Sequence, residues 1–444
     1  MMELLYLLLA VILIIVLTTR LKVHPFIALF VISIGYGLIA GMPYDAIITS
    51  INGGFGNTLG KVGLIIFLGV IIGAFLENTG GAYTIAEKVL GLIGRKRVTS
   101  AMGIIGYIVS IPVFADSGFL LLHPLNKSLS RKAKLSISGS AVALGVGLLA
   151  SHTLVPPTPG PIAAAGLIGA DLGLVIGLGI PVSIVALAAA IFFAKKYASK
   201  TYISPAAGED NPDTVEAVEN RPGPLRSSIP ILVPILLIVL KSVFNPERTG
   251  WEGGLIDFIG FVGEPVIALL IGVFLCLLLP QKISYEMLST TGWVGKAVKD
   301  AASIVLITGA GGIFGQILQD SGIATTLGQS LSPLNLGIFL PFVLAAALKT
   351  AQGSSTVALI TAASILMPMM STLGFETDIE KALVVLAIGS GSSVISHAND
   401  SFFWVVTQMS GMGVNTGYRL FSLGTFVLGI TGALMVFLFH VLLV

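Results

Sequence analysis

The chain has 444 residues, of which 55% are hydrophobic and only 10% are charged, against roughly 25% charged residues in an average soluble protein. The mean hydropathy is +0.98, and apolar runs long enough to cross a bilayer recur from end to end, which excludes a soluble globular protein and predicts an all-α polytopic membrane protein. The net charge of +2 indicates no nucleic acid partner, and the single cysteine, Cys276, excludes an intrachain disulfide.

The first apolar run, residues 4–17, lacks a basic leader and a small-residue cleavage site. It therefore predicts the first membrane helix rather than a removed signal peptide. Two further runs, residues 25–40 and 62–75, predict two more crossings of the bilayer.

Residues 98–126 are too short, and too polar around 114–119, to form two full spans. We interpret them as a re-entrant hairpin with Asp116 at its tip. A carboxylate at membrane depth is costly and usually lines a pathway or relays protons, so Asp116 is a proton-coupling candidate. The competing interpretation is a solvated loop aspartate. Ser117 and Gly118 permit a tight turn that exposes backbone amides, and we expect both to contact a substrate.

Residues 135–170 predict a helix that is broken near residues 151–161, where four prolines interrupt it. Prolines stop a helix and free carbonyl groups to face a ligand or ion. The substrate-binding candidates in this break are Thr153, Thr158 and Gly160. His152 is a candidate proton relay because histidine titrates near physiological pH, although a lone histidine is more often a structural residue.

Residues 195–228 hold ten charges, five of each sign, and predict a cytoplasmic linker. The linker divides the chain into residues 1–194 and 229–444. The two parts contain matching segments in the same order, at offsets of 240, 242 and 245 residues: 25–29 with 265–269, 76–85 with 318–327, and 151–152 with 396–397. These matches predict two copies of one membrane unit.

Basic residues indicate that the second copy is inverted. The first-half loops near residues 88–97 and 127–134 are rich in lysine and arginine, whereas their counterparts at 329–337 and 370–381 are uncharged or acidic. Lysine and arginine concentrate in cytoplasmic loops. We therefore predict two inverted-topology repeats, each with about five crossings, a re-entrant hairpin and a broken helix.

The second predicted hairpin spans residues 336–369, and its tip has the composition of an anion cradle. Glycine allows close backbone approach, and serines can cap a half-helix whose amides point at a ligand. The lysine of this segment could neutralise a substrate carboxylate or a buried aspartate, or it could extend to the membrane interface. The substrate-binding candidates here are Lys349, Gln352, Gly353, Ser354, Ser355 and Thr356.

The second predicted broken helix spans residues 382–414. Asn399 and Ser401 offer hydrogen bonds to substrate hydroxyl groups, while His397 and Asp400 are proton-coupling candidates. The competing interpretation is a helix N-cap, because Asn, Asp and Ser are preferred caps for a helix that starts near Phe402.

These four motifs, at residues 114–119, 152–161, 349–356 and 396–402, together resemble those of the gluconate permease family of the ion-transporter superfamily, and the likeness covers essentially the whole chain. The resemblance implies proton-coupled uptake of a sugar acid or other small hydroxylated carboxylate across the bacterial inner membrane. It also implies a homodimer and an elevator-like movement of the hairpin domain. Gluconate, related aldonates and uronates, and D-serine are all substrates within the family.

The sequence therefore predicts a secondary transporter without a cofactor or a metal site, and no Walker motif indicates ATP. One alternative is a sodium-coupled carrier of organic anions or D-serine with the same fold. A second alternative, from another class, is an intramembrane enzyme that uses Asp116 and Asp400 as paired aspartates.

Overall fold

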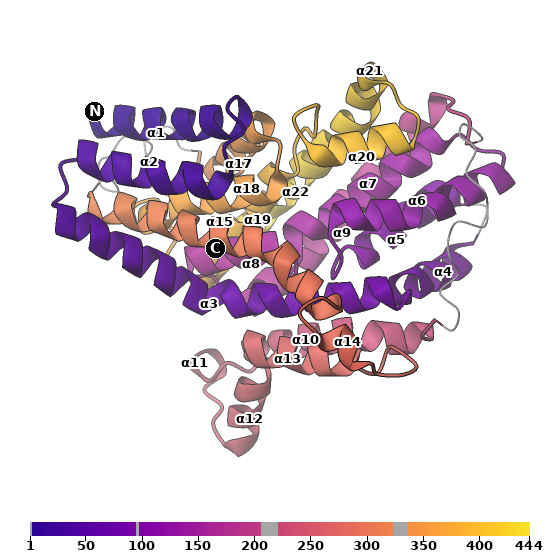
Figure 1. The fold of residues 1–444 in the computed structure, drawn as a ribbon, viewed down its shortest axis with the longest axis horizontal. Coiled ribbons are helices and arrows are strands. Elements are labelled where there is room, and N and C mark those ends of the chain that lie inside the picture. The colour runs from indigo at the N-terminus through magenta and orange to yellow at the C-terminus, as the bar shows by residue number, and fades with distance from the viewer. Residues whose placement is uncertain (1, 95–96, 206–220, 323–335) are drawn as a thin grey trace.

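The computed structural model describes residues 2–94, 97–205, 221–322 and 336–444, which contain helices and turns and no strand (Figure 1). The all-α class predicted from the sequence is therefore confirmed. Before the linker the elements are α1 (Met2–Thr19), α2 (Pro25–Ile39), α3 (Tyr44–Asn78), α4 (Gly81–Ile93), α5 (Val98–Val109), α6 (Ala115–Lys132), α7 (Ile137–Leu154), α8 (Pro159–Ile168), α9 (Leu172–Lys196) and η1 (Ala198–Lys200).

The second half has the same kinds of elements. They are α10 (Pro224–Val243), α11 (Pro246–Thr249), α12 (Gly254–Val262), α13 (Pro265–Cys276), α14 (Tyr285–Leu288), α15 (Trp293–Asp320), α17 (Phe339–Gln352), α18 (Ser355–Leu366), η3 (Met367–Met369), α19 (Asp378–Ser392), α20 (Ser401–Met409), α21 (Val414–Gly417), η4 (Tyr418–Ser422) and α22 (Leu423–Leu443). Most of the predicted uncharged loop 329–337 lies outside the described residues.

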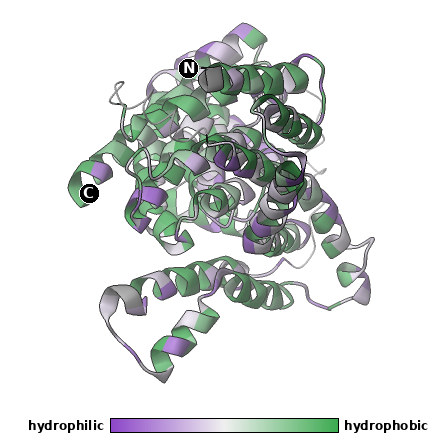
Figure 2. Ribbon diagram, turned by 90° about the vertical axis from the view of Figure 1, so that its left-hand side faces the viewer, coloured by the Kyte–Doolittle hydropathy of each residue, from purple (hydrophilic) through white to green (hydrophobic). Residues whose placement is uncertain are grey.

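Within the described ranges, six helices are long and apolar enough to cross a membrane, or seven if the bent pair α12 and α13 counts as one span. Hydrophobic residues dominate nearly every helix (Figure 2). Many large apolar side chains point outward, Phe274 and Leu236 among them. Such a surface is costly in water and natural in a bilayer, so the chain is a multi-pass membrane protein.

Helix α3 differs most from its predicted extent. The apolar run 62–75 is only the second half of a 35-residue helix, about 50 Å long at 1.5 Å per residue. The first half carries Asp45 and several Asn, Ser and Gly residues, which hid it in the hydropathy pattern. It is helical because it packs closely on α15, where a Cβ on Gly54 would lie 2.6 Å from the Gly312 carbonyl oxygen.

The predicted linker, residues 195–228, is partly helical at both ends, since α9 continues to Lys196 and α10 begins at Pro224. Its first residues are tied to the turn between α6 and α7. Ser136 Oγ donates to the Thr201 carbonyl and accepts from the Ile203 amide, at 2.9 Å in both cases. Residues 206–220 of the predicted linker lie outside the described ranges.

The helices pack in pairs that recur between the two halves. Contacts of α2 with α15 are matched by contacts of α13 with α3, and α5 with α7 by α17 with α19. In the same way α8 packs on α18 while α6 packs on α20. The hairpins α5–α6 and α17–α18 lie toward opposite ends of the molecule (Figure 1).

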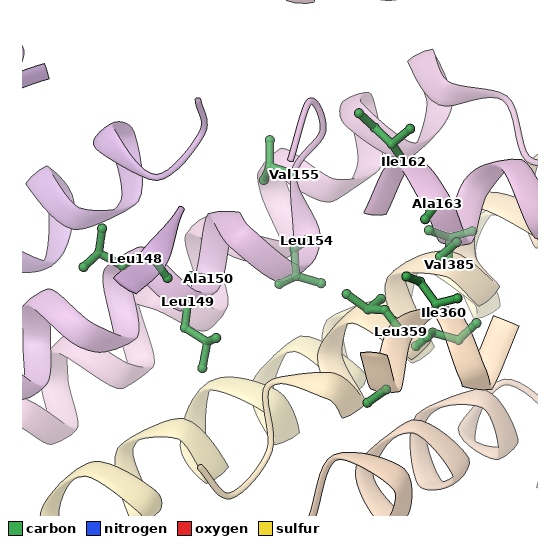
Figure 3. Close-up of a cluster of buried hydrophobic side chains, with 14 of the residues drawn as sticks. Leu148, Leu149, Ala150, Leu154, Val155, Ile162, Ala163, Leu359, Ile360 and Val385 are labelled. Carbon is green, nitrogen blue, oxygen red and sulfur yellow. The ribbon is translucent and has the colours of Figure 1, made fainter. Parts of the chain in front are cut away.

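The core is densest around α7, in which every residue is buried. Figure 3 shows Leu154 of α7 near apolar side chains of α8, α18 and α19, including Ile162, Leu359 and Val385. The contacts agree, since α8 packs on α18 and α19. This apolar packing fixes the broken helices against the second hairpin, so the polar breaks are held at defined positions.

Candidate functional site

The four interruptions predicted from the sequence are real breaks between helices. The first hairpin turns at residues 110–114 and the first broken helix at 155–158. The second hairpin turns at Gly353 and Ser354, and the second broken helix opens over residues 393–400. Irregular backbone at membrane depth is tolerated where protein or a water-filled cavity surrounds it.

A buried ion pair joins the second hairpin to the second break. Lys349 is 1% exposed, and its Nζ lies 2.6 Å from Asp400 Oδ2. Lys349 also donates to the Gly353 carbonyl, and the Ser396 hydroxyl donates to Asp400. Of the three roles considered for Lys349, the structure shows the neutralisation of a buried aspartate. Asp400 Oδ1 also accepts from the Phe402 amide at 3.0 Å, so Asp400 is the N-cap of α20 as well.

Side chains of the second break satisfy the carbonyl groups at the end of α17. His397 Nε2 lies 2.7 Å from the Thr350 carbonyl oxygen, and Asn399 Nδ2 donates to the carbonyls of Thr350 and Ala351 at 2.9 and 3.0 Å. A helix end leaves four carbonyl groups without intrahelical partners. His397 and Asn399 therefore act as a C-terminal cap, and the hairpin tip and the break form one unit.

Gly353 is required at this junction for two reasons. Its φ of +85° favours glycine, and a Cβ there would lie 2.2 Å from the Asn399 carbonyl oxygen. From the sequence we expected another group to lie close to the backbone at Gly353. In the structure that group is the backbone of the second break, at Asn399.

Two residues that we did not select from the sequence hold the second break in place. The Thr425 hydroxyl accepts from the Ser396 amide at 3.0 Å, and the Ser422 hydroxyl donates to the Ser396 carbonyl. Ile395 has a φ of +47°, which is strained for a β-branched residue. Strain of this kind persists only where the surroundings enforce it, and the anchored Ser396 next to it provides that constraint.

The first break faces the start of α18. His152 Nε2 lies 3.3 Å from Thr356 Oγ1, and a Cβ on Gly160 would lie 2.8 Å from a Leu359 methyl group. The ring of Phe114, from the first hairpin, lies 6.3 Å from the His152 ring. His152, Phe114 and Thr158 also line a small cavity of about 10 Å³, close to the space that one water molecule needs.

Two side chains at this place are buried without complete hydrogen bonding. Among the described residues, Gln352 Oε1, Gln352 Nε2 and His152 Nδ1 have no partner. A buried polar group without a partner costs about 1–3 kcal/mol, and native proteins leave few of them. Next to them Ser354 Oγ accepts from the Val357 amide and caps α18. The amides of Ser355 and Thr356, in the first turn, have no partner within the helix.

Asp116 lies in the first turn of α6, one residue past its start, and its side chain is exposed rather than buried. We predicted Asp116 at the tip of the hairpin. The turn is made by residues 110–114, and Asp116 follows it in the first turn of α6. Asp116 is still within electrostatic range of Asp400 and Lys349. Ser117 is half-buried beside it, and Gly118 packs against Leu148.

The hydroxyl groups of the first break are engaged locally. Thr153 Oγ1 donates to the Leu149 carbonyl at 3.0 Å, and Thr158 Oγ1 donates to the Val155 carbonyl at 2.8 Å. Both residues are at most 3% exposed. These two residues therefore stabilise the break, while Ser401 and Asn399 in the second break are exposed and accessible to a ligand.

The described residues hold no group of three or more His, Cys, Asp or Glu side chains that could bind a metal ion. The site consists instead of amides, hydroxyls, the imidazoles of His152 and His397, and the ion pair of Lys349 with Asp400. This composition suits a small polar anion.

A profile of the GntP family of permeases matches residues 2–442. The chain belongs to the GntP permease family. It is 33% identical to a gluconate permease of Pseudomonas aeruginosa, over 97% of this chain and 95% of that protein. It is 31% identical to the low-affinity gluconate transporter of Escherichia coli strain K12, over 96% of this chain and 95% of that protein. The family is one of transporters, so this permease is not an enzyme.

The fold of this permease resembles that of a solved transporter. The crystal structure of the YdaH transporter of Alcanivorax borkumensis aligns with a TM-score of 0.66 over 94% of this chain and 98% of that chain, at 14% identity. At that identity the likeness concerns the fold alone. In this GntP permease, the polar groups gathered between the two hairpin turns and the two helix breaks form the candidate substrate site.

Proposed function

We propose that this permease is a proton-coupled symporter that takes up gluconate or a related small hydroxylated carboxylate. The observation that carries the proposal is a set of buried polar atoms without partners, both amide atoms of Gln352 and Nδ1 of His152, near the start of α18. A substrate that supplies the missing partners would remove the cost of leaving these groups unpaired.

The substrate carboxylate would lie at the first turn of α18, against the amides of Ser355 and Thr356, because a helix N-terminus favours an anion. Gln352, His152 and the exposed Asn399 and Ser401 would bind the hydroxyl groups. Relatives named as gluconate permeases or as a low-affinity gluconate transporter, at 31–33% identity, support this class of substrate. Lys349 would act indirectly, since its charge is already neutralised by Asp400.

Asp116 is the carboxylate best suited to carry the coupling proton. Asp400 accepts hydrogen bonds from Lys349, Ser396 and the Phe402 amide, so protonation of Asp400 would break the junction that it holds. Asp116 has no hydrogen-bond or ion-pair partner among the described residues and is exposed. It could therefore gain and lose a proton without disturbing the fold. His152 would then stabilise the substrate rather than relay a proton.

Two inverted repeats would alternate access to this site. The recurring helix pairs support the proposal. Helix α3 of the first half packs on α15 of the second half, and the hairpin of each half packs on the broken helix of the other half. The large apolar interior around α7 supports an elevator-type movement of the hairpins and broken helices as one body. The family resemblance supports a homodimer in the bacterial inner membrane. The basic residues of the first-half loops support an orientation with the N-terminus outside and the linker in the cytoplasm.

Uptake by purified protein in proteoliposomes tests the proposal. Labelled gluconate should accumulate when an inward proton gradient is imposed in sodium-free buffer, and unlabelled glucuronate, glycerate and D-serine should compete to different extents. Accumulation that follows a sodium gradient at constant pH would instead support a sodium-coupled carrier. Failure to transport any of these compounds would refute the proposed function.

A further inference from the structure

A second and larger cavity lies between α3, α8, α9, α10 and α13, away from the site described above. Its volume is about 390 Å³, within the range of roughly 300–1,000 Å³ that is typical of ligand pockets. Figure 1 shows α10 and α13 running beneath α3, and residues of all three helices line the cavity. Four charged side chains line it: Lys61, Asp171, Lys241 and Glu264.

The chain path places this cavity on the face opposite the linker. Helix α9 ends and α10 starts at the linker, while the cavity is lined by Asp171 at the start of α9 and Lys241 near the end of α10. With the linker in the cytoplasm, the cavity opens toward the outside.

The two cavities follow the same pair of helices. The small cavity beside His152 is lined by residues 69–70 of α3 and by residues 157–159 at the first break. The larger one is lined by Lys61, Val62 and Ile65 of α3 and by Ile162, Ala165 and Gly166 of α8. The two helices pack on each other, and at the outer cavity a Cβ on Gly166 would lie 2.1 Å from a Val62 methyl group. The packed interface of α3 and α8 therefore runs from the outer cavity toward the first break.

Three of the four charges around the outer cavity are already engaged. Lys241 forms an ion pair with Glu264. Asp171 Oδ1 accepts from the Leu174 amide and the Ser242 hydroxyl, both at 2.7 Å. Lys61 is exposed to the cavity and has no ion-pair or hydrogen-bond partner within the described ranges. It is thus the one lining charge that remains available to an incoming anion.

We propose that this cavity is an outer vestibule in which Lys61 captures the substrate carboxylate before the α3–α8 interface opens to the central site. The inference rests on the proposed function for its ligand class. A charge-assisted hydrogen bond to a carboxylate is worth roughly 1.5–3 kcal/mol, which is a factor of about ten or more in affinity. In this role Lys61 binds the substrate before translocation and takes no part in the translocation step. A change at Lys61 should therefore alter the KM of uptake and its dependence on salt, and leave Vmax largely unchanged.

Kinetics of gluconate uptake by Lys61→Gln proteoliposomes test this role. We expect KM to rise about tenfold with Vmax within twofold of the wild type, and we expect KM to lose most of its dependence on ionic strength. Lys61→Arg, the matched control, should keep a KM near that of the wild type. Glu264→Gln should lower KM, because it releases the charge of Lys241 into the same cavity.

Chemical modification provides a second measurement that does not depend on comparing separate variants. Cys276 is the only cysteine and is buried, so the thiol of a Lys61→Cys variant can be modified selectively. Modification from outside with a cationic aminoethyl thiosulfonate should restore a low KM, a neutral reagent of similar size should not, and gluconate should slow both reactions.

Failure of the vestibule proposal can be distinguished from failure of the proposed function. If the wild type transports gluconate and Lys61→Gln leaves KM and its salt dependence unchanged, the vestibule is wrong and the proposed function stands. If the wild type transports none of the tested carboxylates, the proposed function fails, and the vestibule's ligand class fails with it. If the neutral reagent lowered the KM of Lys61→Cys to the same extent as the cationic reagent, the proposed role of the positive charge would also be wrong.

Discussion

Lys349 and Asp400, 51 residues apart in the sequence, form a buried ion pair that joins the tip of one membrane hairpin to the break in a membrane helix. Each partner also holds a second group. Lys349 donates to the Gly353 carbonyl, and Asp400 caps α20. The pair therefore organises the site by fixing its two most irregular segments against each other.

Removing one partner of this ion pair should lower the stability of the protein more than replacing both partners with apolar residues. Lys349→Ala leaves Asp400 buried and uncompensated, at a cost of about 3–5 kcal/mol, whereas an apolar pair of similar volume is often tolerated. We expect Lys349→Met and Asp400→Leu to lower the thermal unfolding temperature in detergent strongly as single variants, and the double variant to recover part of the loss. A double variant at least as unstable as the worse single one would contradict an ion-pair role.

A substitution at Gln352 distinguishes a ligand-binding role of this side chain from a structural role, because the two roles predict different effects on stability and on uptake. Because its amide is buried without a partner, Gln352→Leu should leave the unfolding temperature unchanged or raise it, while gluconate uptake falls at least about tenfold. Gln316→Leu is a suitable control, since that glutamine donates to Asp320 in α15, away from the site. If Gln352→Leu destabilised the protein and kept normal KM, the side chain would be structural.

Asp116 should uncouple transport from protons when it is neutralised. Asp116→Asn is expected to abolish accumulation against a gradient, because the coupling proton has no acceptor, while exchange of labelled for unlabelled gluconate continues. Comparing proton-driven uptake with counterflow in the same proteoliposomes measures this. Normal proton-driven accumulation by Asp116→Asn would show that another group carries the proton.

Gly353→Ala should disrupt the site even though the change is one methyl group. The added Cβ would lie 2.2 Å from the Asn399 carbonyl oxygen at a positive φ, which forces the hairpin tip and the second break apart. We expect loss of uptake and a clear drop in unfolding temperature. Gly177→Ala in α9, where a Cβ meets nothing within 4 Å, is the control and should be neutral or slightly stabilising. Equal effects of the two changes would count against the close contact.

The sequence predicted the features that depend on local pattern. Apolar runs, proline clusters and turn residues gave the all-α class and the positions of the four breaks, because helices in lipid must satisfy their own backbone groups. The arrangement of the site depends on contacts between residues far apart in the sequence, and a local sequence pattern does not predict such contacts. Lys349 had three possible roles until its partner Asp400 was placed, and the anchoring of Ser396 by Ser422 and Thr425 left no local signal.

Two differences have a clear physical origin. Asp116 was expected at the tip of the hairpin, but the turn is complete at residue 114, and Asp116 belongs to the first turn of α6. The first half of α3 looked like a loop because it is rich in Gly, Asn and Ser. In the fold, the small residues allow the close approach of α15.

The central claim is that a hydroxylated carboxylate binds between the start of α18 and the first helix break. A cryo-electron microscopy map of the purified protein with saturating gluconate tests it most directly. We predict ligand density in contact with Gln352 and His152, with its carboxylate at the amides of Ser355 and Thr356. Density elsewhere in the protein, with this site empty, would contradict the account.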